Sequence, residues 1–195
     1  MRAVLASGNP NKARELGDVL RGWQIEPLGV DLPAETGSTF YENARAKAEF
    51  ARTVSSPDMW VLADDSGLEV EALGGAPGIR SARYAGPGAS DAENVALLLA
   101  ELRDVPIERR GARFVAEIVC LPPAGGELAG SGSLEGSIAA DPRGSDGFGY
   151  DPVFVPEGER RTVAELGHAW KRVHSHRARA ARALLDGIRT GAESL

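Results

Sequence analysis

The sequence has a single cysteine among its 195 residues and no long apolar run. One cysteine cannot form an internal disulfide. Cys120 lies in the apolar segment 114–121, so we expect a small core residue rather than a nucleophile. No stretch approaches the ~20 apolar residues that a membrane-spanning helix needs. The first residues lack a basic segment followed by a long apolar one, so we expect no signal peptide. These absences predict a cytoplasmic protein that does not partner a membrane.

A positive net charge is also missing, because the formal net charge is −6 at pH 7. Proteins whose whole surface tracks nucleic acid are usually basic, so we expect no nucleic-acid partner. The positive charge that is present gathers near the C-terminus, where residues 171–182 hold five lysines and arginines and two histidines. Such a segment suits a small polyanion bound locally; the alternative is the solvated face of a helix.

The hydrophobic pattern predicts strands alternating with helices in the first half and long paired strands in the second half. This order of elements is typical of an α/β fold with a mixed β-sheet. The expected strands are 2–6, 60–63, 113–121 and 127–139. The expected helices are one that ends at Gly22, one that begins near Thr39, one over 90–102, a helical turn at 162–166, and a last helix over 169–188.

The turn after the first strand has the composition of a phosphate-binding turn. Residues 7–12 read Ser-Gly-Asn-Pro-Asn-Lys, so backbone N–H groups, the positive end of a helix dipole and Lys12 come together there. Gly8 lets the backbone approach a ligand closely. The segment is not a Walker motif. The alternative is an ordinary turn in which Asn9 precedes a proline at the first helical position.

Two carboxylates stand side by side after an apolar segment. Asp64 and Asp65 follow residues 60–63, and neighbouring carboxylates at a strand end repel each other unless a cation or donors stabilise them. Mg²⁺ fits, because it takes one or two protein carboxylates together with phosphates and water. The alternative is a turn, where Asp and Gly are common.

The helix that begins near Thr39 carries a third acid and a lysine. Glu42 has the spacing of a capping box and could simply satisfy a backbone N–H, or it could complete a metal site. Lys47 lies four residues after Asn43, on the same helix face, and could reach a phosphate.

Residues 147–151, Gly-Phe-Gly-Tyr-Asp, place two aromatic rings among glycines. A ring on a flexible backbone suits stacking against a flat base, and the Asp151 carboxylate can accept hydrogen bonds from a base or orient an arginine. The alternative is a core strand that begins at Tyr150, with Phe148 as a packing residue.

The last helix supplies three further donors, Lys171, His176 and Arg177. The first two lie only roughly on one helix face. A distortion near Ser175 would let them converge.

Taken in order, these segments resemble the inosine triphosphate pyrophosphatase family, also called the dITP/XTP pyrophosphatases. The resemblance covers nearly the whole chain, and the order and spacing of its motifs are specific. The motifs are Ser7-Gly8-Asn9-x-x-Lys12, Phe40-x-Glu42-Asn43-Ala44-x-x-Lys47-Ala48, Ala63-Asp64-Asp65-Ser66-Gly67-Leu68, Leu73-Gly74-Gly75-Ala76-Pro77-Gly78, Ser81-Ala82-Arg83-Tyr84, Gly147-Phe148-Gly149-Tyr150-Asp151-Pro152-Val153-Phe154, Ala164-Glu165-Leu166 and Lys171-x-x-x-Ser175-His176-Arg177.

The resemblance implies a single domain over residues 1–195. It implies a long central mixed β-sheet flanked by helices, two lobes around an active-site cleft, and a homodimer. The implied reaction is NTP + H₂O → NMP + pyrophosphate with Mg²⁺. The implied substrates are deaminated purine nucleotides such as dITP, ITP, XTP and dXTP, which the enzyme would remove from the nucleotide pool.

Roles carry over from the family motif by motif. The resemblance implies that Asp65 accepts the proton of the attacking water and that Glu42, Asp65 and Asp64 hold the metal. The implied substrate contacts come from Ser7, Gly8, Asn9, Pro10, Asn11, Lys12, Lys47, Ser66, Phe148, Gly149, Tyr150, Asp151, Lys171, His176 and Arg177.

The chain departs from the family pattern in three places. Ser7 replaces the commoner threonine, Asp146 stands where a glycine is frequent, and residues 167–170 differ from the usual charged run. Two alternatives stay open: a pyrophosphatase of pyrimidine or other modified NTPs on a similar scaffold, and a non-catalytic nucleotide-binding module.

Overall fold

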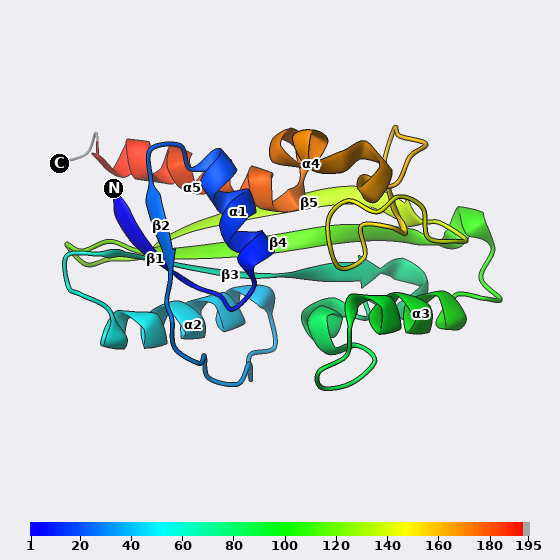
Figure 1. The fold of residues 1–195 in the computed structure, drawn as a ribbon, viewed down its shortest axis with the longest axis horizontal. Coiled ribbons are helices and arrows are strands. Elements are labelled where there is room, and N and C mark those ends of the chain that lie inside the picture. The colour runs from blue at the N-terminus through cyan, green and yellow to red at the C-terminus, as the bar shows by residue number, and fades with distance from the viewer. Residues whose placement is uncertain (193–195) are drawn as a thin grey trace. The chain divides into compact units, whose positions relative to one another are not determined.

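The structure, a computed structural model, describes residues 1–192 (Figure 1). Eleven regular elements and three short 3₁₀ helices follow each other along these residues. They are β1 (Arg2–Ala6), α1 (Pro10–Val19), β2 (Gln24–Pro27), α2 (Phe40–Val54), β3 (Trp60–Val70), η1 (Glu71–Leu73), η2 (Gly78–Arg83), α3 (Asp91–Glu101), η3 (Ile107–Arg109), β4 (Gly111–Leu121), β5 (Leu128–Ile138), β6 (Phe154–Pro156), α4 (Val163–His174) and α5 (His176–Ala192).

The strands form one six-stranded sheet in the order β2-β1-β3-β4-β5-β6. β1 pairs in parallel with β2 and β3, whereas β5 and β6 are antiparallel. The prediction of an α/β fold with a mixed β-sheet flanked by helices is therefore confirmed. In the described part of the chain, no helix is long and apolar enough to cross a membrane.

Capping chemistry fixes where three helices begin. Thr39, Ser90 and Thr162 each accept a hydrogen bond from the backbone N–H three residues on, and a glutamate at that position bonds back to the cap. Each box satisfies two N–H groups that a helix start leaves unbonded. The capping interpretation of Glu42 is thus confirmed.

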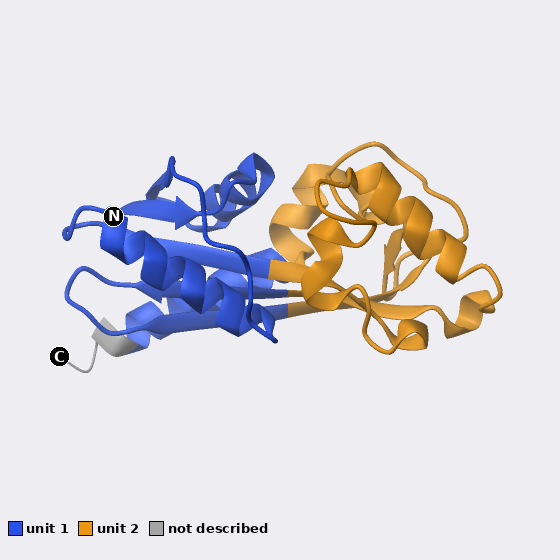
Figure 2. Cartoon of the chain, turned by 90° about the horizontal axis from the view of Figure 1, so that it is seen from below, with its two compact units in different colours: residues 1–65, 116–132, 176–195 blue, residues 66–115, 133–175 orange. Residues whose placement is uncertain are grey.

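The chain divides into two compact units (Figure 2). Unit 1 comprises residues 1–65, 116–132 and 176–195, and unit 2 comprises residues 66–115 and 133–175. The single domain with two lobes over 1–195 stays a prediction, and its last three residues lie outside the described ones.

In unit 1, α1 and α5 cover one face of the strands and α2 covers the other (Figure 1). Leucines and alanines of α1, α5 and the strands form the core, with Cys120 buried among them. Burial raises the pKa of this thiol to about 12, so Cys120 is the unreactive core residue that was predicted.

Glycines of β5 let α5 approach the sheet closely. A Cβ at Gly132 would lie 2.3 Å from the carbonyl oxygen of His176, and one at Gly130 would lie 2.2 Å from that of Ala180. These glycines bring the α5 backbone down onto β5, and the first turn of α5 carries His176 and Arg177.

Unit 2 has its own core, built from β3, β4, β5, α3 and the segment that ends in β6. Leu68, Leu98, Ile138 and Phe154 are fully buried in it. α3 and α4 lie on opposite sides of these strands (Figure 1).

Two predicted boundaries were wrong, and two strands were missed. The strand expected at 60–63 continues to Val70, so Asp64 and Asp65 lie inside a strand and not at its end. The strands β2 and β6 were not predicted. The last helix is divided at Ser175, where extended backbone separates α4 from α5 and where a distortion was predicted.

Candidate active site

Asp64 is completely buried and is held by two cations of unit 1. Arg177 donates from Nε and Nη2 to its two oxygens at 3.1 and 3.3 Å, and Lys12 Nζ lies 2.7 Å from Oδ1. Burial alone would raise the pKa of the Asp64 carboxyl, but these two cations outweigh burial and hold it well below its ordinary value. Asp64 is therefore a permanent carboxylate.

Glu15 shares Arg177 with Asp64. Arg177 Nη1 donates to Glu15 Oε2 at 2.5 Å, and the side chain of Glu15 is only 5% exposed. Since α1 contributes Glu15, β3 contributes Asp64 and α5 contributes Arg177, one guanidinium ties three elements of unit 1 together. Sequence reasoning missed Glu15, although it stands one helical turn after Lys12.

Asp65 faces a different set of groups. Successive side chains of a strand point to opposite faces of a sheet, and Asp65 meets Lys47 and Asn43 of α2, whereas Asp64 meets α1 and α5. Lys47 Nζ donates to Asp65 Oδ1 at 2.8 Å and Asn43 Nδ2 to Oδ2 at 3.3 Å. The expected repulsion between neighbouring carboxylates is avoided in this way.

The Asp65 carboxyl is more basic than an exposed aspartate. Burial raises its pKa, and the ion pair with Lys47 opposes this only in part. Lys47 stays protonated, because Asp65 and Glu35 outweigh the effect of burial and raise its pKa. Glu35 Oε1 lies 3.0 Å from Lys47 Nζ, and sequence reasoning missed this acid as well.

Two ammonium groups converge on one backbone oxygen. Lys47 Nζ donates to the carbonyl oxygen of Asp64 at 2.9 Å, and Lys12 Nζ reaches the same atom at 3.5 Å. The ladder between β1 and β3 ends one residue earlier, at Ala6 and Ala63, so this carbonyl lies at the carboxyl end of β1. Ligands of open α/β sheets bind at such strand ends.

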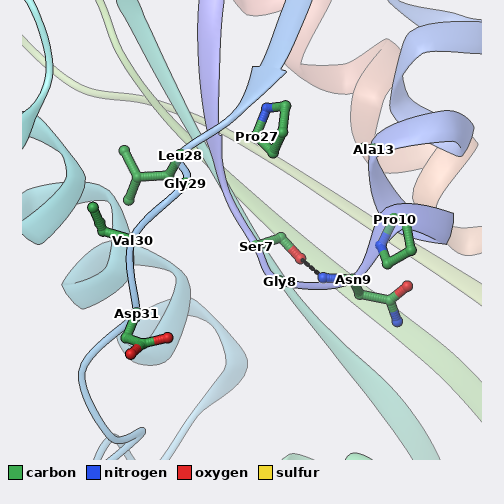
Figure 3. Close-up of a pocket in the computed structure, with 10 residues that line it drawn as sticks. All are labelled: Ser7, Gly8, Asn9, Pro10, Ala13, Pro27, Leu28, Gly29, Val30 and Asp31. Carbon is green, nitrogen blue, oxygen red and sulfur yellow. Dashed lines mark hydrogen bonds between the residues drawn. The ribbon is translucent and has the colours of Figure 1, made fainter.

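The turn between β1 and α1 borders a hollow of about 640 Å³ in unit 1 (Figure 3). Its walls are residues 7–10 with Ala13 on one side and residues 27–31 on the other. Asn9 caps α1 and Pro10 is the first helical residue, as the alternative interpretation of this turn predicted. Ser7 Oγ and Asn9 Oδ1 accept bonds from two backbone N–H groups of the turn, at 3.2 and 2.9 Å. A phosphate there would compete with these oxygens.

The candidate metal ligands have suitable chemistry but form no ready-made cage. Among residues 1–192, no group of three or more His, Cys, Asp or Glu side chains is placed to hold a metal ion. Mg²⁺ needs only one or two protein carboxylates when phosphates and water complete its shell. Asp65 suits this role better than Asp64, whose two oxygens are both paired with cations.

Glu42 can combine its cap with a ligand role. Its three bonds, from Ser38 N, Ser38 Oγ and Thr39 N at 2.7, 2.7 and 3.2 Å, all fall on Oε2. Hydrogen bonds from Ser38 and Thr39 hold its pKa below the ordinary value and keep it ionised.

In unit 2, Asp151 organises the segment 147–151. Its Oδ2 accepts from the backbone N–H of Phe148 at 2.9 Å and from Lys171 Nζ at 2.6 Å. Lys171 Nζ lies 4.4 Å from the centre of the Phe148 ring, a cation–π contact. Gly147 has φ of +89°, and a Cβ there would lie 2.1 Å from Asp151 Oδ2, so only glycine fits.

Tyr150 is a structural residue of the same segment. It is buried, and its hydroxyl donates to the carbonyl oxygen of Ser81 at 2.9 Å. Burial raises its pKa. Tyr150 therefore stays protonated and fastens the segment to η2, which leaves Phe148, half-buried, as the ring that can meet a base.

The structure thus gathers the predicted residues into two sets. Unit 1 holds Ser7, Gly8, Asn9, Pro10, Asn11, Lys12, Glu42, Lys47, Asp64, Asp65, His176 and Arg177, and unit 2 holds Ser66, Phe148, Gly149, Tyr150, Asp151 and Lys171. Arg177 is paired with acids of unit 1, and Lys171 is the ion-pair partner that the structure gives Asp151. Whether Arg177 also meets a base stays a prediction.

Fold and site together define an open-sheet α/β protein in which buried lysine, arginine and aspartate residues meet at a strand end beside a helix N-terminus. A profile of the Ham1 family matches residues 3–187, and the chain belongs to this family.

Close relatives span the full length of the chain. The dITP/XTP pyrophosphatase of Bdellovibrio bacteriovorus is 45% identical over 97% of this chain and 98% of that protein. The dITP/XTP pyrophosphatase of Mycobacterium tuberculosis is 48% identical over 97% and 96%. The structure of a HAM1 protein from Coxiella burnetii superposes with a TM-score of 0.84 at 39% identity and covers 98% of this chain and 99% of that one.

Proposed function

We propose that this protein is a nucleoside triphosphate pyrophosphatase that converts non-standard purine nucleotides to monophosphates and pyrophosphate. The observation that carries the proposal is the convergence of Lys12 and Lys47 on the Asp64 carbonyl oxygen, next to the carboxyl of Asp65. Two ammonium groups at one point suit adjacent phosphates of one chain. The names of the bacterial relatives support the same activity.

In the proposed reaction, Asp65 accepts a proton from the water that attacks the α-phosphorus. Its raised pKa makes it a better base than an exposed aspartate. Lys12 and Lys47 bind the phosphates. To do so, each would give up part of its ion pairing with carboxylates of the protein. Mg²⁺, held by Glu42 and Asp65, would neutralise charge on the phosphate oxygens when bound.

The base would stack on Phe148, and donors would read its keto oxygens. Lys171 is already placed over this ring by Asp151; His176 and Arg177 are the other proposed donors. Adenine presents an amino group at the six position, so a donor would face a donor. Each buried donor left unpaired costs about 1–3 kcal/mol, which is the basis of discrimination.

The test is a substrate panel with dITP, ITP, XTP, ATP and dTTP, in which pyrophosphate release is measured with Mg²⁺ and again with EDTA. We expect kcat/KM for the deaminated purines to exceed that for ATP by at least about a hundredfold, since two unpaired donors are at stake. EDTA should abolish activity and added Mg²⁺ should restore it. Equal rates on dTTP and ITP would favour the modified-NTP alternative, and no release from any substrate would favour a binding module.

We also propose a homodimer, on the family resemblance alone. Light scattering should give twice the mass of one chain at micromolar concentration. A monodisperse monomer would contradict the proposed homodimer but would leave the proposed reaction unaffected.

A further inference from the structure

On one side, the segment with Phe148 borders a hollow. This hollow of about 470 Å³ separates the segment from the apolar face of α3, and Val95, Leu99, Phe148 and Gly149 are among the residues that line it. Interiors are normally close-packed, so filling by side chains is what usually fixes a ring in place. Beside this hollow, hydrogen bonds to the backbone have to contribute more to fixing the Phe148 ring.

One of these bonds comes from α3. Asp91 Oδ2 accepts the backbone N–H of Gly149 at 2.6 Å, across 58 residues of sequence. Charge-assisted bonds of this kind are the short and strong ones. Gly149 has φ of +62°, a left-handed conformation that glycine adopts without strain.

α3 is a firm support for this contact. Asp91 is its first residue and lies inside the capping box, between Ser90 and Glu93. Further along the helix, Leu98 is fully buried in the core. Asn94 is buried too, and its side chain accepts from the N–H of Ala85 and donates to the carbonyl oxygen of Ala82. A carboxylate at the start of a helix is also favoured by the helix dipole.

We propose that Asp91 is a positioning residue for base recognition. Two successive backbone N–H groups are held by two carboxylates, Phe148 by Asp151 and Gly149 by Asp91. The two peptide groups that flank the Cα of Phe148 are thereby fixed, and with them the direction in which its side chain leaves the backbone. The proposal rests on the proposed function, because it assigns Phe148 the base. The proposed role of Asp91 involves no contact with the base or with phosphate.

The experiment compares Asp91→Ala with Asp91→Asn, whose amide oxygen can still accept from Gly149. Asp104→Ala is the matched control. It removes an exposed acid beyond the other end of α3, roughly 16–20 Å away along the helix axis. Each variant is assayed with ITP and ATP, and the hydrogen exchange of the Gly149 amide is followed by NMR. Thermal melting verifies that each variant is folded.

Asp91→Ala should raise KM for ITP about three- to tenfold, the effect of losing one exposed charge-assisted bond. We expect kcat to stay within about twofold, because the phosphate and proton-transfer groups are unaltered. The Gly149 amide should exchange faster. Asp91→Asn should restore both properties, and Asp104→Ala should change neither.

Three results would overturn the proposal: an unchanged KM for ITP in Asp91→Ala, a fall in kcat as large as the rise in KM, or no rescue by asparagine. A wild-type protein without preference for ITP over ATP would instead refute the proposed function. The exchange rate of the Gly149 amide would then still decide whether Asp91 anchors the segment.

Discussion

Asp65→Asn should lower kcat for ITP by at least about a hundredfold, since general-base assistance alone is typically worth 10²–10⁴. The substitution keeps the shape of the side chain but removes its charge and its basicity. Burial already disfavours the charged form of Asp65, so the neutral amide should cost little stability. The loss should therefore be kinetic, with a melting temperature near that of the wild type.

A magnesium titration separates the two roles proposed for Asp65. If the residue acts mainly as a metal ligand, high Mg²⁺ concentrations should recover most of the rate. If it acts mainly as the base, kcat should stay low at saturating Mg²⁺. A kcat within a few-fold of the wild type under all conditions would show that Asp65 only holds Lys47 and Asn43.

Local rules predicted much of the fold because the decisive groups are neighbours in sequence. The capping box at Thr39 and the turn at Asn9 and Pro10 each depend on residues at most three positions apart. The same locality explains the division of the last helix near Ser175. A distortion there was predicted from the spacing of Lys171 and His176 along the chain.

The interior of β3 could not be predicted in the same way. Two aspartates followed by Ser and Gly have the composition of a turn. The strand continues only because Asp64 finds its cations on α1 and α5 while Asp65 finds its own on α2. A buried acid can occupy a strand when such partners exist, and those partners are distant in sequence.

Glu15 is the clearest example of a contact that could not be predicted because its partner is distant in sequence. It stands 162 positions from Arg177, the residue to which it bonds. As one more acid in a helix of mixed character, it carries no sequence signal for that contact. The strands β2 and β6, with four and three residues, were missed because they are too short for a periodic pattern to emerge.

Arg177→Met should destabilise the protein by about 3–5 kcal/mol, because it removes the guanidinium that pairs with two buried carboxylates. Asp64 would keep Lys12, whereas Glu15, at 6% exposure, would lose the guanidinium that lies 2.5 Å from it. For a chain of this length the loss corresponds to a fall in melting temperature of roughly 6–20 °C. Thermal unfolding followed by circular dichroism measures it.

Arg189→Met is the matched control. Arg189 lies on the same helix and also pairs with an aspartate, Asp186, but both side chains are about seven-tenths exposed. Pairs of this kind contribute about 0–1 kcal/mol. Both variants lose one arginine charge, so the difference between their losses of stability measures the effect of burying the ion pair.

The pH dependence of the stability loss in Arg177→Met tests whether the buried acids cause it. In the wild type, Arg177 and Lys12 hold the pKa of Asp64 below its unfolded value. The stability that Asp64 contributes is therefore present above that unfolded value and is lost as pH falls through the folded one. In Arg177→Met the buried acids should have raised pKa values, so protonation favours the fold. The stability gap between variant and wild type should narrow from neutral pH down to about pH 5.

A second substitution tests whether the negative charge of Glu15 contributes to the loss of stability. Adding Glu15→Gln to Arg177→Met removes one of the two buried negative charges that Arg177 faced and should recover a large part of the lost stability. If Arg177→Met costs less than about 1 kcal/mol, within the range of exposed pairs, the buried network does not depend on this guanidinium. Arg177 would then be available for the base contact that the sequence suggested, and its loss should appear in KM for ITP and not in the melting curve.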